Sequence, residues 1–217
     1  VVPASTLLLE QAMETLLQDS DSVLLITNSQ FIDKIDAIKP ELPEIAEDRY
    51  ILTGGSNYAG YLDYNALKSA AGDQEPKGIV VNWDDVFNIM YSSGTTGLPK
   101  KVGHTAASYP IGHLSTAVMI GIRPDDIHHN LSAPGWAKWA WSSFFAPLNV
   151  GATATAFHFT ALDGMNYMEC LTKHKVSVFC APPTAWRVFI NLDTSSFDFS
   201  HLRQSIGAGE PLNPEII

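Results

Sequence analysis

One short stretch decides how this chain folds: residues 87–100, with the sequence FNIMYSSGTTGLPK. Its first four residues form an apolar, strand-like run, and positions 92–100 then hold four hydroxyl side chains, two glycines and a lysine. Glycine permits positive φ and lets a ligand approach backbone N–H groups, while hydroxyls and an ammonium add further donors. Such a lining suits phosphate oxygens. The alternative is an ordinary turn, because Ser, Thr and Gly also gather in turns.

The spacing of the glycines separates this loop from two familiar nucleotide motifs. A Walker-type loop has four residues between its glycines and then Lys followed by Ser or Thr. Here only two residues separate Gly94 from Gly97, and Lys100 follows after two more. Similarly, Gly207 and Gly209 lack the third glycine of a dinucleotide fingerprint, because Leu212 stands in its place. Neither motif is therefore present.

From about residue 79 onward, short β-branched runs alternate with longer helix-like stretches. This alternation is typical of a largely parallel sheet with crossover helices, so the predicted fold class is α/β. The strand candidates are residues 86–92, 128–132, 152–157, 176–180 and 204–207. The helix candidates are residues 105–120, 137–149, 162–174 and 183–191. The loop is expected to lie between a strand and a helix.

The part of the chain before residue 79 is less regular. We expect a helix at 8–18, strands at 23–27 and 50–53, and an exposed connector at 63–78. The sequence thus predicts two parts. Residues 1–78 form a partial N-terminal subdomain with its connector, and residues 79–217 form the α/β subdomain that contains the loop.

Composition excludes several classes of protein. The 217 residues carry a net charge of -10, which argues against nucleic-acid partners. The apolar runs are far shorter than the roughly 20 residues that a membrane span requires, so a cytoplasmic protein is expected. Cys170 and Cys180 are expected to be free thiols. His128 and His129 would point to opposite faces of a strand, so no metal site is predicted.

The loop resembles, almost letter for letter, the phosphate-binding signature of the adenylate-forming superfamily, which includes acyl-CoA synthetases, luciferases and peptide-synthetase adenylation domains. The resemblance extends along the chain. Residues 1–7 are similar to an earlier proline-containing motif of the family, 133–136 to its aromatic motif, and 207–212 to the start of its adenine-binding motif. Residues 134–138 and 141–145 most resemble the acetyl- and medium-chain acyl-CoA synthetase branch.

This resemblance implies a two-step reaction that uses ATP, Mg²⁺ and coenzyme A. A carboxylic acid is first converted to an acyl adenylate, and the coenzyme A thiol then displaces AMP. The fold it implies is the central part of the large N-terminal domain of such an enzyme, truncated at the adenine-binding motif. The small C-terminal domain would be missing, so the 217 residues alone are expected to lack turnover.

The resemblance also implies roles for individual residues. The β- and γ-phosphates would be held by Ser92, Ser93, Gly94, Thr95, Thr96, Gly97, Leu98, Pro99 and Lys100. Thr96 and Lys100 would act in catalysis. Adenine would contact Gly209, Glu210 and Pro211, and Trp136 would lie near the acyl or pantetheine channel.

One position departs from the family pattern, and two other functions stay open. Lys101 replaces a common glycine, and its charge would either help the phosphates or face water. A stand-alone nucleotide-binding or regulatory module would bind ATP without needing an acid. A purely structural fragment would bind neither ATP nor an acid.

Overall fold

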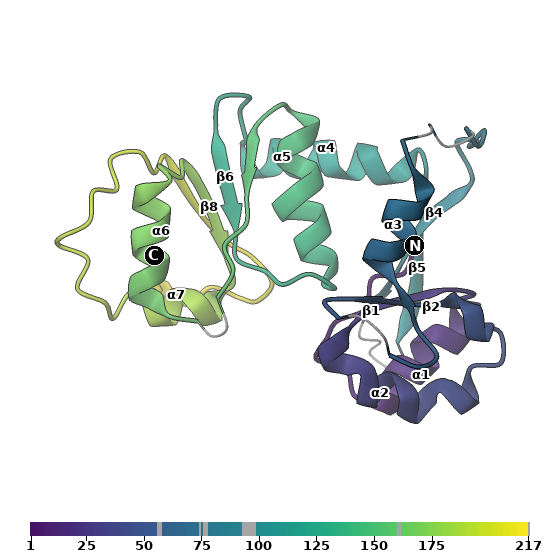
Figure 1. Ribbon diagram of the computed structural model, residues 1–217. Helices are drawn as coiled ribbons and strands as arrows, with labels where there is room; N and C mark the ends of the chain where they lie inside the picture. The colour runs from purple at the N-terminus through teal and green to yellow at the C-terminus, as the bar shows by residue number, and fades with distance from the viewer. Residues whose placement is uncertain (56–57, 74, 76–77, 93–98, 160–161, 217) are drawn as a thin grey trace. The chain divides into compact units, whose positions relative to one another are not determined.

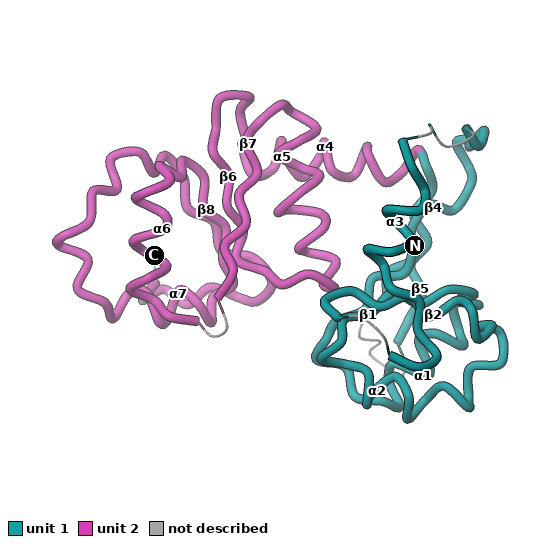
Figure 2. The backbone as a smooth tube through the Cα atoms, viewed as in Figure 1, with its two compact units in different colours: residues 1–106 teal, residues 107–217 magenta. Residues whose placement is uncertain are grey.

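The computed structural model describes residues 1–55, 58–73, 75, 78–92, 99–159 and 162–216. The chain forms two compact units, residues 1–106 and 107–217 (Figure 2). The division expected after residue 78 falls inside the first unit and stays a prediction.

The first unit contains a three-stranded parallel sheet in the order β1-β2-β3. The strands are β1 (Leu25–Asn28), β2 (Tyr50–Thr53) and β3 (Leu62–Asp63). The helices are α1 (Glu10–Asp19), α2 (Ile32–Ile38) and α3 (Tyr64–Ala71), with short 3₁₀ turns at Ser29–Phe31, Lys39–Glu41 and Glu47–Arg49. Helix α3 occupies much of the expected connector, and its residues are indeed largely exposed.

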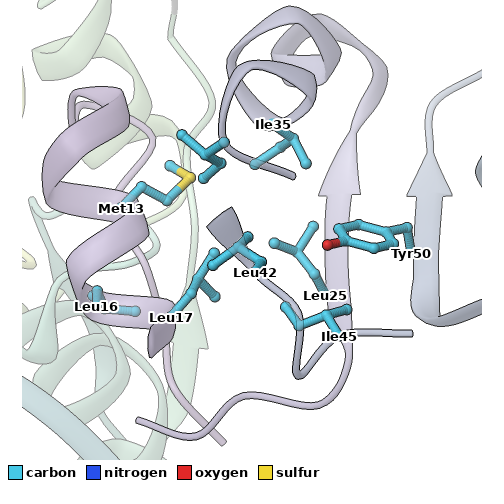
Figure 3. Close-up of a cluster of buried hydrophobic side chains, with 9 residues drawn as sticks. Met13, Leu16, Leu17, Leu25, Ile35, Leu42, Ile45 and Tyr50 are labelled. Carbon is cyan, nitrogen blue, oxygen red and sulfur yellow. The ribbon is translucent and has the colours of Figure 1, made fainter. Parts of the chain in front are cut away.

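Apolar side chains from α1, α2 and the sheet build the core of this unit (Figure 3). Met13 and Leu17 of α1 lie in the same cluster as Ile35 of α2 and Leu25 of β1. Residues 32, 35 and 38 of α2 are all buried isoleucines, a spacing that places them on one helical face. The burial of these stripes against the sheet holds both helices in place.

A β-hairpin completes the first unit. Strands β4 (Val86–Ser92) and β5 (Lys100–Thr105) pair antiparallel, with Ser92 opposite Lys100. The expectation that a helix follows the loop directly was wrong, because α4 (Ser108–Ile120) begins only after β5. Residues 100–105 contain only one large apolar residue, Val102, and they form a strand because β4 offers them a pairing edge.

The second unit contains four parallel strands in the order β7-β6-β8-β9. They are β6 (Ile127–Asn130), β7 (Thr153–Thr155), β8 (Val178–Ala181) and β9 (Gln204–Gly207). The helices are α4, α5 (Ala146–Asn149), α6 (Gly164–Lys173) and α7 (Pro183–Phe189). A π-helix, Trp139–Phe145, leads into α5, and a 3₁₀ turn occupies Pro214–Ile216.

Helices cover both faces of this second sheet, with α6 and α7 on one side and α4 and α5 on the other (Figure 1). Strand β8 shows the consequence, since Phe179 packs with α6 and α7 while Val178 packs with α4 and α5. Alternate residues of a strand point to opposite faces, so a strand buried on both sides is apolar throughout. The chain thus has the expected α/β fold, with largely parallel sheets flanked by helices.

Two smaller features bear on the sequence predictions. Cys170 and Cys180 are both free thiols, and Cys180 is buried while Cys170 is half-buried. Among the described residues, none of the helices has the length and apolar character that crossing a membrane demands.

Candidate functional site

The base of the β4–β5 hairpin carries the ends of the candidate phosphate loop. Ser92 and Lys100 are cross-strand partners and both are exposed, and the Ser92 hydroxyl lies 3.5 Å from the Lys100 carbonyl oxygen. Pro99 is exposed beside them. The other loop residues of the sequence prediction lie outside the described part of the chain: Ser93, Gly94, Thr95, Thr96, Gly97 and Leu98.

The next cross-strand pair in the hairpin, Tyr91 and Lys101, contacts the end of helix α1. The Tyr91 hydroxyl donates to Asp19 Oδ2 at 2.6 Å, and the Lys101 ammonium lies 3.3 Å from the same oxygen. Lys101 also donates to the Asp19 backbone carbonyl. The sequence could not reveal this contact, because Asp19 and Tyr91 lie 72 positions apart.

In the second unit, the carboxyl ends of the parallel strands form another candidate edge. The chain passes from β6 to β7, which pairs on one side of β6, and then to β8, which pairs on the other side of β6. In open α/β sheets, ligands bind at the carboxyl ends of the strands where the strand order reverses in this way. Asn130 ends β6 and Ala181 ends β8.

Buried polar groups lie at this edge. The Asn130 amide nitrogen donates to Ser143 Oγ at 2.8 Å, while Asn130 Oδ1 is buried and accepts no hydrogen bond from the described residues. The half-buried Lys138 ammonium donates to the Ala208 carbonyl at 3.1 Å. Burial lowers the pKa of Lys138 and raises the pKa of the nearby Cys180 thiol. Lys138 thus ties the segment after β6 to the segment after β9.

The residues expected near adenine and the acyl group also lie in this unit. Gly209, Glu210 and Pro211 follow β9 and are exposed, and Gly209 has φ 110, which side-chain-bearing residues rarely adopt. Glu210 Oε2 lies 3.8 Å from Arg187 of α7. Trp136 is 53% exposed.

Two neighbouring tryptophans, Trp139 and Trp141, are half-buried in the second unit. Trp141 Nε1 donates to Thr116 Oγ1 at 2.6 Å, and its ring contacts His113 edge-on. Trp139 is half-buried and stacks on Phe144.

His128 and His129 point to opposite faces of β6, as the strand geometry predicts. His128 Nε2 lies 2.9 Å from the Ser142 carbonyl, and His129 Nε2 lies 2.5 Å from the Tyr167 hydroxyl. Burial lowers the pKa of each imidazole to about 4. Both rings are therefore neutral at pH 7 and serve the core.

The second unit has a parallel sheet with helices on both faces and polar groups at the carboxyl ends of its strands. This arrangement is that of the open α/β domains, a class in which ligands bind at that edge. Within that class, the full chain, residues 1–217, matches the family model described as AMP-binding enzyme. The chain belongs to the AMP-binding enzyme family.

The relatives named here are acyl-CoA ligases or synthetases. It is 40% identical to 4-hydroxybutyrate–CoA ligase 1 of Metallosphaera sedula, a match that covers 100% of this chain and 37% of that protein. It is 34% identical to the uncharacterized acyl–CoA ligase YtcI of Bacillus subtilis, covering 100% of this chain and 40% of that one. It is 29% identical to the mitochondrial acyl-coenzyme A synthetase ACSM3 of Mus musculus, covering 100% and 37%. The chain thus spans less than half of these relatives' length.

Solved structures agree on the fold. The anthranilate CoA ligase AuaEII, crystallised with anthranoyl-AMP, matches with a TM-score of 0.86 at 28% identity, over 99% of this chain and 41% of that one. The N-terminal domain of FACL13 from Mycobacterium tuberculosis matches with a TM-score of 0.78 at 22% identity, over 100% and 52%. At that identity the second match speaks for the fold alone.

Proposed function

We propose that this chain supplies the nucleotide-binding part of an enzyme that activates a carboxylic acid with ATP and transfers the acyl group to coenzyme A. The names of its relatives support the reaction class. The observation that carries the assignment is the hairpin, which brings Ser92 and Lys100 together at the two ends of a loop rich in hydrogen-bond donors.

The proposed chemistry has two balanced steps. A carboxylate oxygen attacks the α-phosphorus of ATP, the bond to the bridging oxygen breaks, and pyrophosphate leaves. The coenzyme A thiol then loses its proton and attacks the acyl carbon, and AMP departs. The donors of residues 92–100 would hold the β- and γ-phosphates while charge develops on pyrophosphate. Loss of one such donor typically raises a barrier by about 3 kcal/mol.

Mg²⁺ bound with ATP would neutralise part of the phosphate charge. The described side chains at the base of the loop, a hydroxyl and an ammonium, are hydrogen-bond donors. They fit phosphate oxygens better than they fit the cation, which prefers oxygen ligands such as carboxylates.

The second unit would hold the remainder of the nucleotide and the acyl group. Gly209, Glu210 and Pro211 follow a strand at the carboxyl edge, where exposed backbone groups can meet adenine. Trp136, exposed in the segment after β6, would line the acyl or pantetheine channel.

Turnover would require more than these 217 residues, since the chain spans only 37% of its Metallosphaera relative. We therefore expect residues 1–217 to bind ATP without completing the reaction. The cytoplasmic location stays a prediction, and several relatives are named as mitochondrial.

Calorimetric titration of ATP–Mg²⁺ into residues 1–217 tests the nucleotide assignment. A charge-assisted hydrogen bond contributes about 1.5 to 3 kcal/mol, so Lys100→Ala should weaken binding about 10- to 100-fold. Thr96→Ala, which removes a neutral donor, should weaken it less. The matched control is Lys68→Ala on the exposed helix α3, which should bind as the wild type does.

Other results of these measurements would support a different function. Equal binding by the wild type and both loop variants would show that the loop does not hold phosphate. Binding that is unaffected by a carboxylic acid in the full-length enzyme would favour a regulatory module, and no binding would favour a structural role. Acid-dependent pyrophosphate release by residues 1–217 themselves would contradict the expected lack of turnover.

A further inference from the structure

Two neighbouring residues of the hairpin share one partner on helix α1. Tyr91 of β4 and Lys101 of β5 are directly paired, so their side chains leave the same face of the hairpin. Both reach the Asp19 carboxylate, at 2.6 Å from the Tyr91 hydroxyl and 3.3 Å from the Lys101 ammonium. We call Asp19, Tyr91 and Lys101 the Asp19 clamp.

The clamp is attached to helix α1, which packs into the core of the first unit. Asp19 is the last residue of α1, whose last turn carries no basic side chain of its own. The final carbonyls of a helix lack intrahelical partners and form its negative end. Lys101 donates to the Asp19 carbonyl and so supplies the missing cation from β5. Helix α1 is in turn anchored in the core by Met13, Leu16 and Leu17 (Figure 3).

The charges within the clamp satisfy one another. The hydrogen bond from Tyr91 and the nearby Lys101 lower the pKa of Asp19 despite slight desolvation. Burial and the adjacent Asp19 raise the pKa of Tyr91, so its hydroxyl stays protonated and donates. The Lys101 charge is therefore directed toward Asp19.

We propose that the Asp19 clamp positions Ser92 and Lys100, the two ends of the phosphate loop, for a polyphosphate ligand. The inference rests on the proposed function. Ser92 directly follows Tyr91, and Lys100 directly precedes Lys101, so the clamp fixes the residue next to each end of the loop. Binding groups that are already held in place lose less conformational freedom when the ligand arrives. Asp19, Tyr91 and Lys101 are positioning residues in this scheme.

A simpler rival is that Lys101 attracts phosphate through its charge alone. The two ideas predict opposite signs for one substitution. If only charge matters, Asp19→Asn removes a negative group near the phosphates and should tighten binding. If the clamp positions the loop, Asp19→Asn weakens binding although the site becomes more positive. Tyr91→Phe changes no charge, so only the clamp predicts an effect.

The experiment is calorimetric titration of tripolyphosphate with Mg²⁺ into residues 1–217. The clamp links are partly exposed and so are individually modest; Asp19→Asn, Tyr91→Phe and Lys101→Met should each weaken binding about 2- to 5-fold. Lys101→Arg should restore most of the affinity, since Arg can also donate to Asp19. Asp21→Asn is the matched control, because it removes the same charge at an exposed position two residues away. It should leave binding unchanged or slightly tighter.

The outcomes separate this inference from the proposed function. If the wild type binds tripolyphosphate but Asp19→Asn tightens it as Asp21→Asn does, and Tyr91→Phe has no effect, the clamp has no positioning role. If the wild type binds neither tripolyphosphate nor ATP, the proposed function fails and the inference fails with it. Thermal unfolding of each variant should stay within a few degrees of the wild type, because surface links affect stability little.

Discussion

At the scale of single residues, an ion pair joins Asp126 to Arg203 in the second unit. Asp126 is 4% exposed and accepts hydrogen bonds from the Ser177 hydroxyl at 2.7 Å and from the Arg123 backbone at 2.7 Å. The Arg203 guanidinium donates to both of its carboxylate oxygens. These bonds lower the pKa of Asp126 against the effect of burial. Together they tie the amino-terminal ends of β6, β8 and β9.

Removing Arg203 should therefore destabilise the second unit. Arg203→Met leaves the buried Asp126 carboxylate without its cation, and breaking one side of a buried ion pair costs about 3 kcal/mol. The measurement is urea unfolding followed by tryptophan fluorescence. This probe is suitable because four of the five tryptophans, all except Trp83, lie in residues 107–217.

The matched control in the same unit is Arg187→Met, which breaks a 3.8 Å contact with Glu210 in which the two side chains are 45% and 43% exposed. Exposed pairs contribute about 0 to 1 kcal/mol, so this variant should unfold nearly as the wild type does. Equal unfolding free energies for Arg203→Met and the wild type would show that the Asp126 network does not stabilise the sheet.

At the scale of elements, helix α4 and the π-helix Trp139–Phe145 pack against each other through Trp141. Gly112 lies in the middle of α4, where glycine normally weakens a helix. Its missing side chain is explained by Trp141, because a Cβ at Gly112 would overlap the far edge of the indole ring. The same indole donates to Thr116 one turn further along α4.

Gly112→Ala should consequently destabilise the second unit even though alanine favours helices. Overpacking typically costs about 1 to 3 kcal/mol, which exceeds the gain of about 1 kcal/mol in helix propensity. Near-ultraviolet circular dichroism would detect the displaced indole, and urea unfolding would measure the loss of stability. Gly103→Ala in β5 is the control, since a Cβ there meets its nearest neighbour only at 4.0 Å. A stabilised Gly112→Ala variant would contradict this packing.

Several elements could be predicted from the sequence because their signals are local. β2, β4 and β9 occupy the predicted residues, and α6 and α7 lie inside the predicted ranges. Each combines an apolar pattern with clear boundary residues. Helix α2 is not among the predicted elements, although its isoleucines recur every three residues.

Other elements depend on tertiary contacts. Strand β5 is defined by its pairing with β4, and the π-helical form of 139–145 cannot be inferred from periodicity, which predicted an ordinary helix. The same limit applies to the candidate site. The order of residues 92–100 identified the loop, but the contact of the flanking Tyr91 and Lys101 with Asp19 requires the fold.

At the scale of the whole molecule, the two buried histidines of β6 make stability depend on pH. Burial lowers the pKa of His128 and His129 from 6.5 to about 4. Between these values the unfolded chain binds more protons than the folded chain. The free energy of unfolding should therefore be highest above pH 6.5 and fall as pH decreases toward 4. The slope is at most about 1.4 kcal/mol per pH unit for each histidine.

Urea unfolding at pH 7, 6 and 5 measures this dependence. His129→Gln should remove roughly half of the decrease that the two β6 rings cause, as one of these two rings is gone. His201→Gln, at an exposed position in the same unit, should retain the wild-type dependence. An unfolding free energy that stays constant from pH 7 to 5 would mean that the buried rings do not control stability.

The order of the strands has a practical consequence for handling the protein. In the part of the chain that the structure describes, β1 and β9 each pair on one side only, and Ile26 of β1 is 57% exposed. Edge strands of this kind present unpaired backbone N–H and C=O groups with which an extended peptide can pair. Concentrated solutions should accordingly form intermolecular β-structure, and a lysine in place of Ile26 would be the natural means of keeping the protein monodisperse.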